Sequence, residues 1–376
     1  MVTDLPIDPA RVKRVLIYRL GSLGDTMVAL PALHLVQRTF PQAQRLMLTN
    51  IPIHAKAPAA SAILDGSGLV DGYIQYPMAT RSPWKLAQIW WKIRRFRPDL
   101  LVYLTPPRGK QVADRDLRFF RICGVQNVIG LPVGDLEKCR YDPRTELWER
   151  EAARLARCLA PLGRIDVDDP ENWDLRLTNQ ELRRAAEALA GINGKAFLAC
   201  GPGTKMQAKD WGRENWRALL KKLSASFPQH ALVLVGAAED AEAAEYAASD
   251  WRGLIVNLCG KLTPRQTTAV LRDADVFIGP DSGPMHLAAA YGVPCAIVFA
   301  ARDLPGRWYP AGTANQVIYH RVECAGCMLE TCMEKKKVCL TSVSVEEMFS
   351  AVLQCSSRGR RSPPGHSQKG LNACTS

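Results

Sequence analysis

The stretch Asp275-Val-Phe-Ile-Gly-Pro-Asp-Ser-Gly-Pro-Met-His-Leu-Ala-Ala-Ala-Tyr-Gly-Val-Pro294, followed by Cys-Ala-Ile-Val-Phe299, contains two short apolar runs separated by a polar turn and an alanine-rich segment. Continuous apolar runs of this length are typical of strands that are buried on both faces of a parallel sheet. The segment from Met285 to Tyr291 is closed by Gly292 and Pro294, which predicts a short helix. The order strand, turn, helix, strand indicates an α/β fold.

The turn in this stretch consists of Asp281, Ser282 and Gly283, between the carboxyl end of the first strand and the helix. A helix N-terminus exposes unpaired backbone N–H groups at the positive end of the helix dipole, so such a turn binds anions readily. Gly283 allows close approach of a ligand, and His286, one turn further on, can direct a ring nitrogen to the same place. The alternative is purely structural, with a capped helix and a core histidine.

The composition is that of a globular protein with two domains: 376 residues, of which 47% are hydrophobic and 23% charged. The N-terminal residues are acidic and proline-containing, unlike the basic and then apolar start of a signal peptide. No apolar stretch is long enough to span a bilayer. We therefore expect a cytoplasmic protein that is at most peripheral on the inner membrane.

The net charge of +12 is unevenly distributed. Residues 1–176 contain 26 basic and 19 acidic residues, a net +7, whereas residues 177–355 contain 19 and 18, a net +1. A basic first half is expected to meet an anionic partner, such as an anionic lipid surface or a phosphorylated glycan. Nucleic acid is not expected as a partner, because no recognition motif for it is present.

A second strand–turn–helix unit begins the chain. Arg14 to Tyr18 predicts a buried strand, which is followed by Arg19-Leu-Gly-Ser-Leu-Gly-Asp25. The two glycines have G-x-x-G spacing, which differs from the G-x-G-x-x-G of dinucleotide-binding folds. Asp25 is expected at the carboxyl edge of a sheet, where open α/β folds bind ligands, although a helix cap explains an aspartate there equally well.

Two further turns follow strands in the second half. The strand Ala196 to Cys200 is followed by a glycine-rich loop with Thr204, Lys205 and Lys209. Such a loop can hold a diphosphate, or it can be a flexible surface loop with solvated lysines. Glu239, after the strand from Ala231 to Val235, is a candidate acceptor for a ribose diol, or only an acid favoured by the helix dipole.

Strand–helix alternation in both halves predicts domains over residues 1–176 and 177–355, joined near the acidic segment 166–172 and followed by a disordered basic tail over 356–376. Helices are expected over 84–96, 144–162 and 344–353. The first is interpreted as a crossover helix with Trp84, Trp90 and Trp91 in the core, in preference to a helix that rests on a membrane.

Four of the twelve cysteines cluster as Cys324-x2-Cys327-x4-Cys332-x6-Cys339. Without a secretory signal, thiols or a metal site are favoured over disulfides. A C-x2-C pair with two further thiolates suits a closed tetrahedral site for structural zinc or iron. A set of reduced, packed thiols is the alternative.

Three separated motifs resemble glycosyltransferase family 9, the ADP-heptose:lipopolysaccharide heptosyltransferases, and together they span nearly the whole chain except the tail. They are Arg19-Leu-Gly-Ser-Leu-Gly-Asp25 with Leu30-Pro-Ala-Leu33, Lys209-Asp-Trp211, and Asp281-Ser-Gly-Pro-Met-His286. The late cysteines also resemble those of the family. This sequence departs from the family at two places. Many members have a histidine-containing pair where this chain has Val28-Ala29, and a tryptophan is common where it has Thr204-Lys-Met206. These departures bear on the identity of the acceptor and of the sugar more than on the type of reaction.

The resemblance implies the GT-B architecture, two Rossmann-like α/β domains that face one another across a cleft. It implies an inverting transfer of a heptose or related sugar from a nucleotide-sugar donor, ADP-heptose, to a hydroxyl of a lipopolysaccharide-core-type glycolipid, with no metal or other cofactor required. Asp25 is then the general base, with Arg19 and Gly24 on the acceptor side. The donor side consists of Thr204, Lys205, Lys209, Glu239, Asp281, Ser282, Gly283 and His286.

Two alternatives remain open. One is another GT-B enzyme, such as a nucleotide-sugar epimerase, which would convert the donor without an acceptor. The other is a non-catalytic protein that binds a nucleotide or a glycan without turnover.

Overall fold

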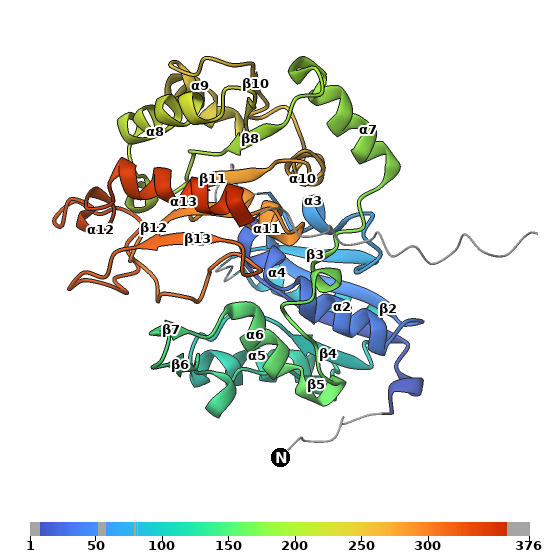
Figure 1. The fold of residues 1–376 in the computed structure, drawn as a ribbon. Coiled ribbons are helices and arrows are strands. Elements are labelled where there is room, and N and C mark those ends of the chain that lie inside the picture. The colour runs from blue at the N-terminus through green and yellow to red at the C-terminus, as the bar shows by residue number, and fades with distance from the viewer. Residues whose placement is uncertain (1–7, 52–57, 79, 81, 359–376) are drawn as a thin grey trace, which may run out of the picture.

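A computed structural model describes residues 8–51, 58–78, 80 and 82–358. Two parallel sheets form its framework, and Figure 1 shows the second sheet above the first. The first has the order β3-β2-β1-β4-β5 and the second the order β10-β9-β8-β11-β12-β13. Each sheet has helices on both faces, as expected for parallel strands that read as continuous apolar runs.

The strands of the first sheet are β1 Arg14–Tyr18, β2 Gln44–Ile51, β3 Gly72–Pro77, β4 Leu100–Tyr103 and β5 Val128–Ile129. The strands of the second sheet are β8 Phe197–Cys200, β9 Ala231–Leu234, β10 Ile255–Asn257, β11 Val276–Pro280, β12 Cys295–Phe299 and β13 Gln316–Tyr319. A short antiparallel hairpin, β6 Tyr141–Asp142 and β7 Leu147–Trp148, lies outside both sheets.

The helices of the first half are α1 Leu23–Met27, α2 Leu30–Thr39, α3 Ser61–Leu64, α4 Pro83–Phe96, α5 Lys110–Ile122 and α6 Glu151–Cys158. The helices of the second half are α7 Asn179–Ala188, α8 Arg213–Ser226, α9 Ala241–Ala248, α10 Pro264–Leu271, α11 Gly283–Ala290, α12 Val338–Thr341 and α13 Val345–Arg358. Among the described residues, none of these helices combines the length and the apolarity that crossing a bilayer requires.

The cores follow from the alternation of side chains along the strands. In β1, Val15 and Ile17 pack on the side of α2, whereas Leu16 and Tyr18 pack on the side of α4 and α5. The core that contains Val15 continues into α10 and α11 of the second half. The two sheets are therefore connected by shared apolar packing, and the turns at their carboxyl edges face one another. The predicted boundaries at residues 176 and 355 remain predictions.

Three sequence-based expectations need correction. The helix predicted over 144–162 is the β6–β7 hairpin followed by the shorter α6. The final helix extends to Arg358, so the first three residues of the predicted tail are helical, and residues 359–376 lie outside the described residues. The interpretation of α4 as a helix with tryptophans in the core is wrong, because Trp84, Trp90 and Trp91 are all exposed.

Candidate functional site

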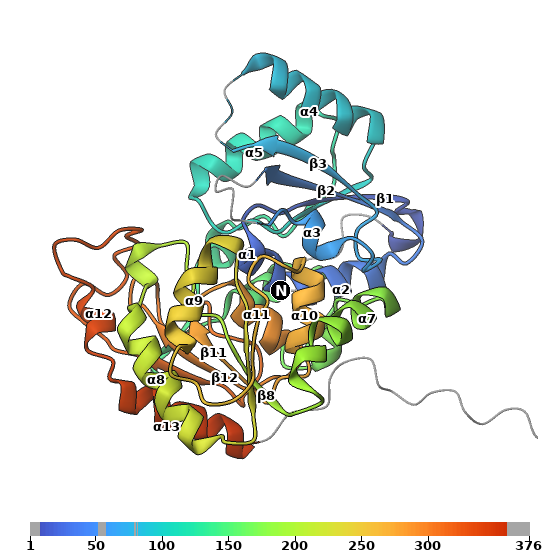
Figure 2. The ribbon, with the colours of Figure 1, turned by 90° about the horizontal axis from the view of Figure 1, so that it is seen from above.

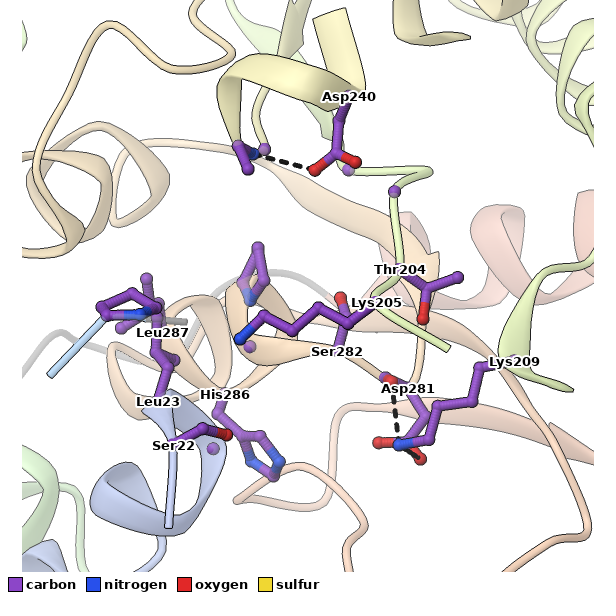
Figure 3. Close-up of a pocket in the computed structure, with 18 of the residues that line it drawn as sticks. Ser22, Leu23, Thr204, Lys205, Lys209, Asp240, Asp281, Ser282, His286 and Leu287 are labelled. Carbon is purple, nitrogen blue, oxygen red and sulfur yellow. Dashed lines mark hydrogen bonds and ion pairs between the residues drawn. The ribbon is translucent and has the colours of Figure 1, made fainter. Parts of the chain in front are cut away.

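A cavity of about 520 Å³ lies between the two sheets and is lined from both sides. The first half contributes the start of α1, and the second half contributes the turns after β8, β9, β11 and β12 (Figure 3). Nine of the predicted site residues line this cavity: Gly24, Asp25, Thr204, Lys205, Lys209, Asp281, Ser282, Gly283 and His286. The motifs of the two halves are thus brought together, as expected for carboxyl edges of open α/β sheets.

Asp25 is held in a fixed orientation in the first turn of α1. Its Oδ2 accepts a hydrogen bond from the backbone N–H of Ser22 at 2.8 Å, as in a capping box. Its side chain remains 26% exposed and lines the cavity. The predicted cap and the predicted cavity position are therefore both present, and they are compatible, because capping occupies only one of the two carboxylate oxygens.

Arg19 holds the turn that contains Asp25 in place. The guanidinium is buried, donates from Nε to the backbone oxygen of Asp25 at 3.0 Å, and lies 3.8 Å from its Oδ1. Burial lowers the pKa of Arg19, and the Asp25 carboxylate opposes this effect. Arg19 does not line the cavity. Its predicted place on the acceptor side stays a prediction, and its contacts are those of a side chain that positions the Asp25 turn.

Two glycines allow α1 and α11 to meet across the cleft. A Cβ atom on Gly24 would lie 3.1 Å from Cδ2 of His286, and one on Gly283 would lie 2.9 Å from a methyl group of Leu23. Larger side chains at these positions would separate the two helices. The absence of a side chain at Gly24 and Gly283 therefore brings Asp25 close to the N-terminus of α11.

The turn before α11 combines several features of an anion site. The hydroxyl of Ser282 is buried, lines the cavity and has no hydrogen-bond partner among the described residues. The helix that follows presents its N-terminal N–H groups to the same space. Lys209 lies beside the turn, where its Nζ is 2.5 Å from Oδ2 of Asp281 (Figure 3). An unpaired buried hydroxyl is costly, so this geometry favours a bound acceptor of hydrogen bonds.

Lys205 and His286 are close enough to interact electrostatically with Asp25. Burial lowers the pKa of Lys205, and the Asp25 and Asp240 carboxylates oppose this. Burial also lowers the pKa of His286 to about 4, whereas the carboxylates of Asp281 and Asp25 raise it. The imidazole is therefore neutral in the folded protein near neutral pH and can donate or accept one hydrogen bond at the cavity wall.

The pKa of His286 predicts a pH-dependent loss of stability. An unfolded histidine has a pKa of about 6.5, so between that pH and about 4 the unfolded chain binds the proton more readily. Above this window the neutral ring makes its full contribution to the free energy of unfolding. Within the window the free energy of unfolding falls by about 1.4 kcal/mol per pH unit as the pH decreases. Urea unfolding of the wild type and His286→Gln is expected to give the same pH dependence above this window and a shallower dependence for the variant within it. Parallel curves throughout would contradict the prediction.

Glu239 does not line the cavity, whereas the next residue, Asp240, does. Oδ2 of Asp240 accepts a hydrogen bond from the backbone N–H of Ala237 at 2.8 Å (Figure 3). The carboxylate fits because Gly203 has no side chain: a Cβ atom there would lie 2.3 Å from Cγ of Asp240. The expected acid at this edge exists, but it is one position further along the chain.

Sequence reasoning missed two sets of lining residues: Arg302, Asp303 and Trp308, which follow β12, and Met328, which follows β13. Trp308 donates from Nε1 to Oδ2 of Asp303 at 2.8 Å. Arg302 is buried and donates to the backbone oxygens of Met328 and Leu329, which attaches the cysteine-containing loop to the cavity wall. These residues could have been found in the sequence by the rule that was applied to the other turns, namely that residues just after the carboxyl end of a parallel strand line the ligand site.

The predicted metal site at Cys324, Cys327, Cys332 and Cys339 is not formed. Within residues 8–51, 58–78, 80 and 82–358, no group of three or more histidine, cysteine, aspartate or glutamate side chains is arranged to hold a metal ion. The four thiols are free, and Sγ of Cys332 accepts a hydrogen bond from the N–H of Lys337 at 3.4 Å. Burial raises the pKa of Cys339, and the nearby Cys324 and Cys332 add to the effect. Cys327 is exposed and the other three cysteines are half-buried.

Comparisons with solved structures support the fold. A glycosyl transferase family 9 protein from Veillonella parvula is 18% identical with a TM-score of 0.66, covering 92% of this chain and 97% of that one. The ADP-heptose lps heptosyltransferase II of E. coli is 16% identical with a TM-score of 0.62, covering 92% and 99%. The predicted GT-B architecture is confirmed.

Comparisons of sequence support the family. Lipooligosaccharide heptosyltransferase 2 of Campylobacter jejuni (serotype O:2) is 29% identical over 165 residues, which are 42% of this chain and 50% of that protein. Lipopolysaccharide heptosyltransferase 3 of Escherichia coli is 29% identical over 137 residues, 36% and 37% of the two chains. The chain thus spans about half the length, or less, of these curated relatives. Residues 143–338, just over half of the chain, match the model of glycosyltransferase family 9 (heptosyltransferase), and the chain belongs to that family.

Proposed function

We propose that this protein is an inverting, metal-independent glycosyltransferase that moves a heptose or related sugar from ADP-heptose to a hydroxyl of a lipopolysaccharide-core-type glycolipid. One observation carries the proposal: a single cavity holds the Asp25 carboxylate on one side and the buried, unpartnered Ser282 hydroxyl at the N-terminus of α11 on the other. This is the arrangement needed to deprotonate an acceptor and to hold a diphosphate leaving group. Among structurally similar proteins, one from E. coli is an ADP-heptose lps heptosyltransferase, and the E. coli heptosyltransferase WaaC has been solved with ADP-2-deoxy-2-fluoro heptose.

The donor diphosphate is expected to occupy the turn before α11. Backbone N–H groups at Ser282 and Gly283, the Ser282 hydroxyl and Lys209 would donate to its oxygens. Lys205 adds a second partly buried cation in the same cavity. Together these groups would stabilise the negative charge that develops on the departing diphosphate.

In the proposed reaction, Asp25 accepts the proton of the acceptor hydroxyl as its oxygen attacks the anomeric carbon. The bond from that carbon to the diphosphate oxygen breaks on the opposite face, so the configuration inverts. The hydrogen bond from the N–H of Ser22 keeps the Asp25 carboxylate oriented at the wall of the cavity. Closure of the two halves around the substrates would exclude water from this space and so limit hydrolysis of the donor.

The anionic glycolipid acceptor is expected to approach from the basic first half of the chain, whose net charge is +7 over residues 1–176. Gly24 lies on this side of the cavity, where it packs against His286. A lipid-anchored acceptor implies activity at the cytoplasmic face of the inner membrane, which remains a prediction.

Asp240, and not Glu239, is expected to bind the ribose of the donor. Asp240→Ala should raise the donor KM by about tenfold to a hundredfold, because a carboxylate that accepts from a diol contributes about 1.5–3 kcal/mol. Glu239→Ala is the matched control, one residue away and outside the cavity, and its donor KM should stay near that of the wild type. Initial-rate kinetics with varied donor measure both. A larger effect from Glu239→Ala would refute the assignment.

The function is tested by incubating the protein with ADP-heptose, with and without a lipopolysaccharide-core acceptor, and analysing products by mass spectrometry. Sugar attached to the acceptor, formed only when both substrates are present, supports the proposal. An altered or free sugar formed without acceptor supports an epimerase, and binding without turnover supports a non-catalytic protein. Calorimetric titration with ADP, UDP and GDP identifies the base of the donor.

A further inference from the structure

Helix α4 (Pro83–Phe96) presents an unusual face to solvent. Its inner face is narrow, with Ile89 and Ile93 buried against the first sheet. Trp84 and Trp91 are 75% and 55% exposed. They are seven residues apart, about two helical turns, and therefore lie on one side of the helix, opposite the two isoleucines. Three exposed tryptophans on one helix, with Trp90 as the third, are not needed for packing and call for another explanation.

The apolar surface continues beyond the helix. Trp90 donates from Nε1 to the backbone oxygen of Ile122 at 3.2 Å, and the side chain of Ile122, at the end of α5, is itself largely exposed. Figure 2 shows α4 and α5 at the end of the molecule farthest from α8 and α13. We name the exposed side chains of Trp84, Trp90, Trp91 and Ile122 the α4 ridge. Within the described part of the second half, up to Arg358, no element covers this ridge.

Basic residues flank the α4 ridge on both sides. By helical spacing, Lys85 and Lys92 lie on one flank and Arg94 on the other, while Arg95 lies 5.5 Å from the ring of Trp91. The helix contains no acidic residue. An apolar ridge with aromatic residues and flanking cations is typical of a helix that lies in the interface of an anionic membrane.

We propose that the α4 ridge docks the protein on an anionic lipid surface, with the tryptophan rings among the acyl chains and headgroups and the lysines and arginines against lipid phosphates. A second copy of the chain is disfavoured as the occupant, because a symmetric contact through α4 would bring like charges together. This inference does not depend on sugar transfer, and it adds a role to α4, which connects β3 to β4 as the predicted crossover helix.

The experiment measures co-sedimentation of the full-length protein with vesicles of phosphatidylcholine alone or with phosphatidylglycerol. The wild type should bind the anionic vesicles, and less so as salt rises. The double variant Trp84→Ala/Trp91→Ala should lower the partition coefficient by about tenfold or more. Met333→Ala, which removes a side chain that is 72% exposed in the other half, is the matched control and should not change binding.

A second pair of variants separates charge from apolar insertion. Lys85→Gln/Lys92→Gln should weaken binding to anionic vesicles but leave the residual binding to neutral vesicles unchanged, whereas Lys195→Gln/Lys335→Gln should change neither. Equal thermal unfolding midpoints verify that each variant is folded. The proposal is overturned if the wild type does not bind anionic vesicles, or if the tryptophan variant binds them as the wild type does. It is also overturned if the tryptophan variant has a lower molecular mass in solution than the wild type, which would identify the ridge as a self-association surface.

Discussion

Asp25→Asn is expected to lower kcat by about 10²–10⁴-fold, the range associated with loss of a positioned general base. The amide retains an oxygen that can accept the hydrogen bond from the N–H of Ser22, so the first turn of α1 should be preserved. What is lost is the ability to take a proton from the acceptor hydroxyl. Steady-state transfer assays measure the effect, and calorimetric binding of ADP should remain near that of the wild type.

Glu347→Gln is the matched control for Asp25→Asn. Glu347 occupies the same place in the first turn of α13, where its Oε2 accepts from the N–H of Ser344 at 2.8 Å, but it lies outside the cavity. This variant tests the effect of neutralising a capping carboxylate without touching the site, and its kcat should be unchanged. Near wild-type transfer by Asp25→Asn would refute the assignment of the base.

Lys209→Met is expected to lower kcat/KM by about 10²–10³-fold. The substitution removes a cation from the proposed diphosphate site and leaves the nearly buried Asp281 carboxylate without its partner at 2.5 Å. Both effects oppose the binding of a charged leaving group. Initial rates at varied donor concentration measure the decrease in kcat/KM. Most of this decrease should persist when the acceptor is saturating.

Two further variants separate these effects. Lys337→Met removes a lysine of similar exposure, 19% against 16% for Lys209, which pairs with Asp210 outside the cavity. It should reduce stability without changing kcat/KM. In Lys209→Met/Asp281→Asn the unpaired carboxylate is also removed. If the double variant regains wild-type activity, Lys209 only neutralises Asp281. If activity stays low, Lys209 contacts the donor, as we expect.

The sequence by itself predicted the elements that depend on local features. The buried strands β1, β8, β9, β11 and β12 were recognisable as apolar runs, because each is covered on both faces. The turns with Asp25, Lys209 and Asp281 follow such strands, and the carboxyl ends of parallel strands share one edge. For these residues, therefore, the position at the cavity could be predicted without knowing how the two halves meet.

Other features were decided by contacts between distant segments. Residues 141–148 form a hairpin, although their neighbours favour a helix, because the N–H of Trp148 donates to the backbone oxygen of Pro305 at 2.8 Å. Asp240 reaches the cavity instead of Glu239, because adjacent residues of a helical turn point in different directions and the space beside Gly203 admits only one of them. Cysteine spacing likewise did not determine whether the four thiols converge.

In helix α4, the features that the sequence determines are most clearly separate from those that the tertiary structure decides. Its sequence determined that the segment is helical, that Trp84 and Trp91 share one face and that Ile89 and Ile93 share the opposite face. Both faces are apolar, so periodicity alone could not tell which one is buried. Only the tertiary structure decided this, because the first sheet covers the isoleucines and no other described element covers the tryptophans.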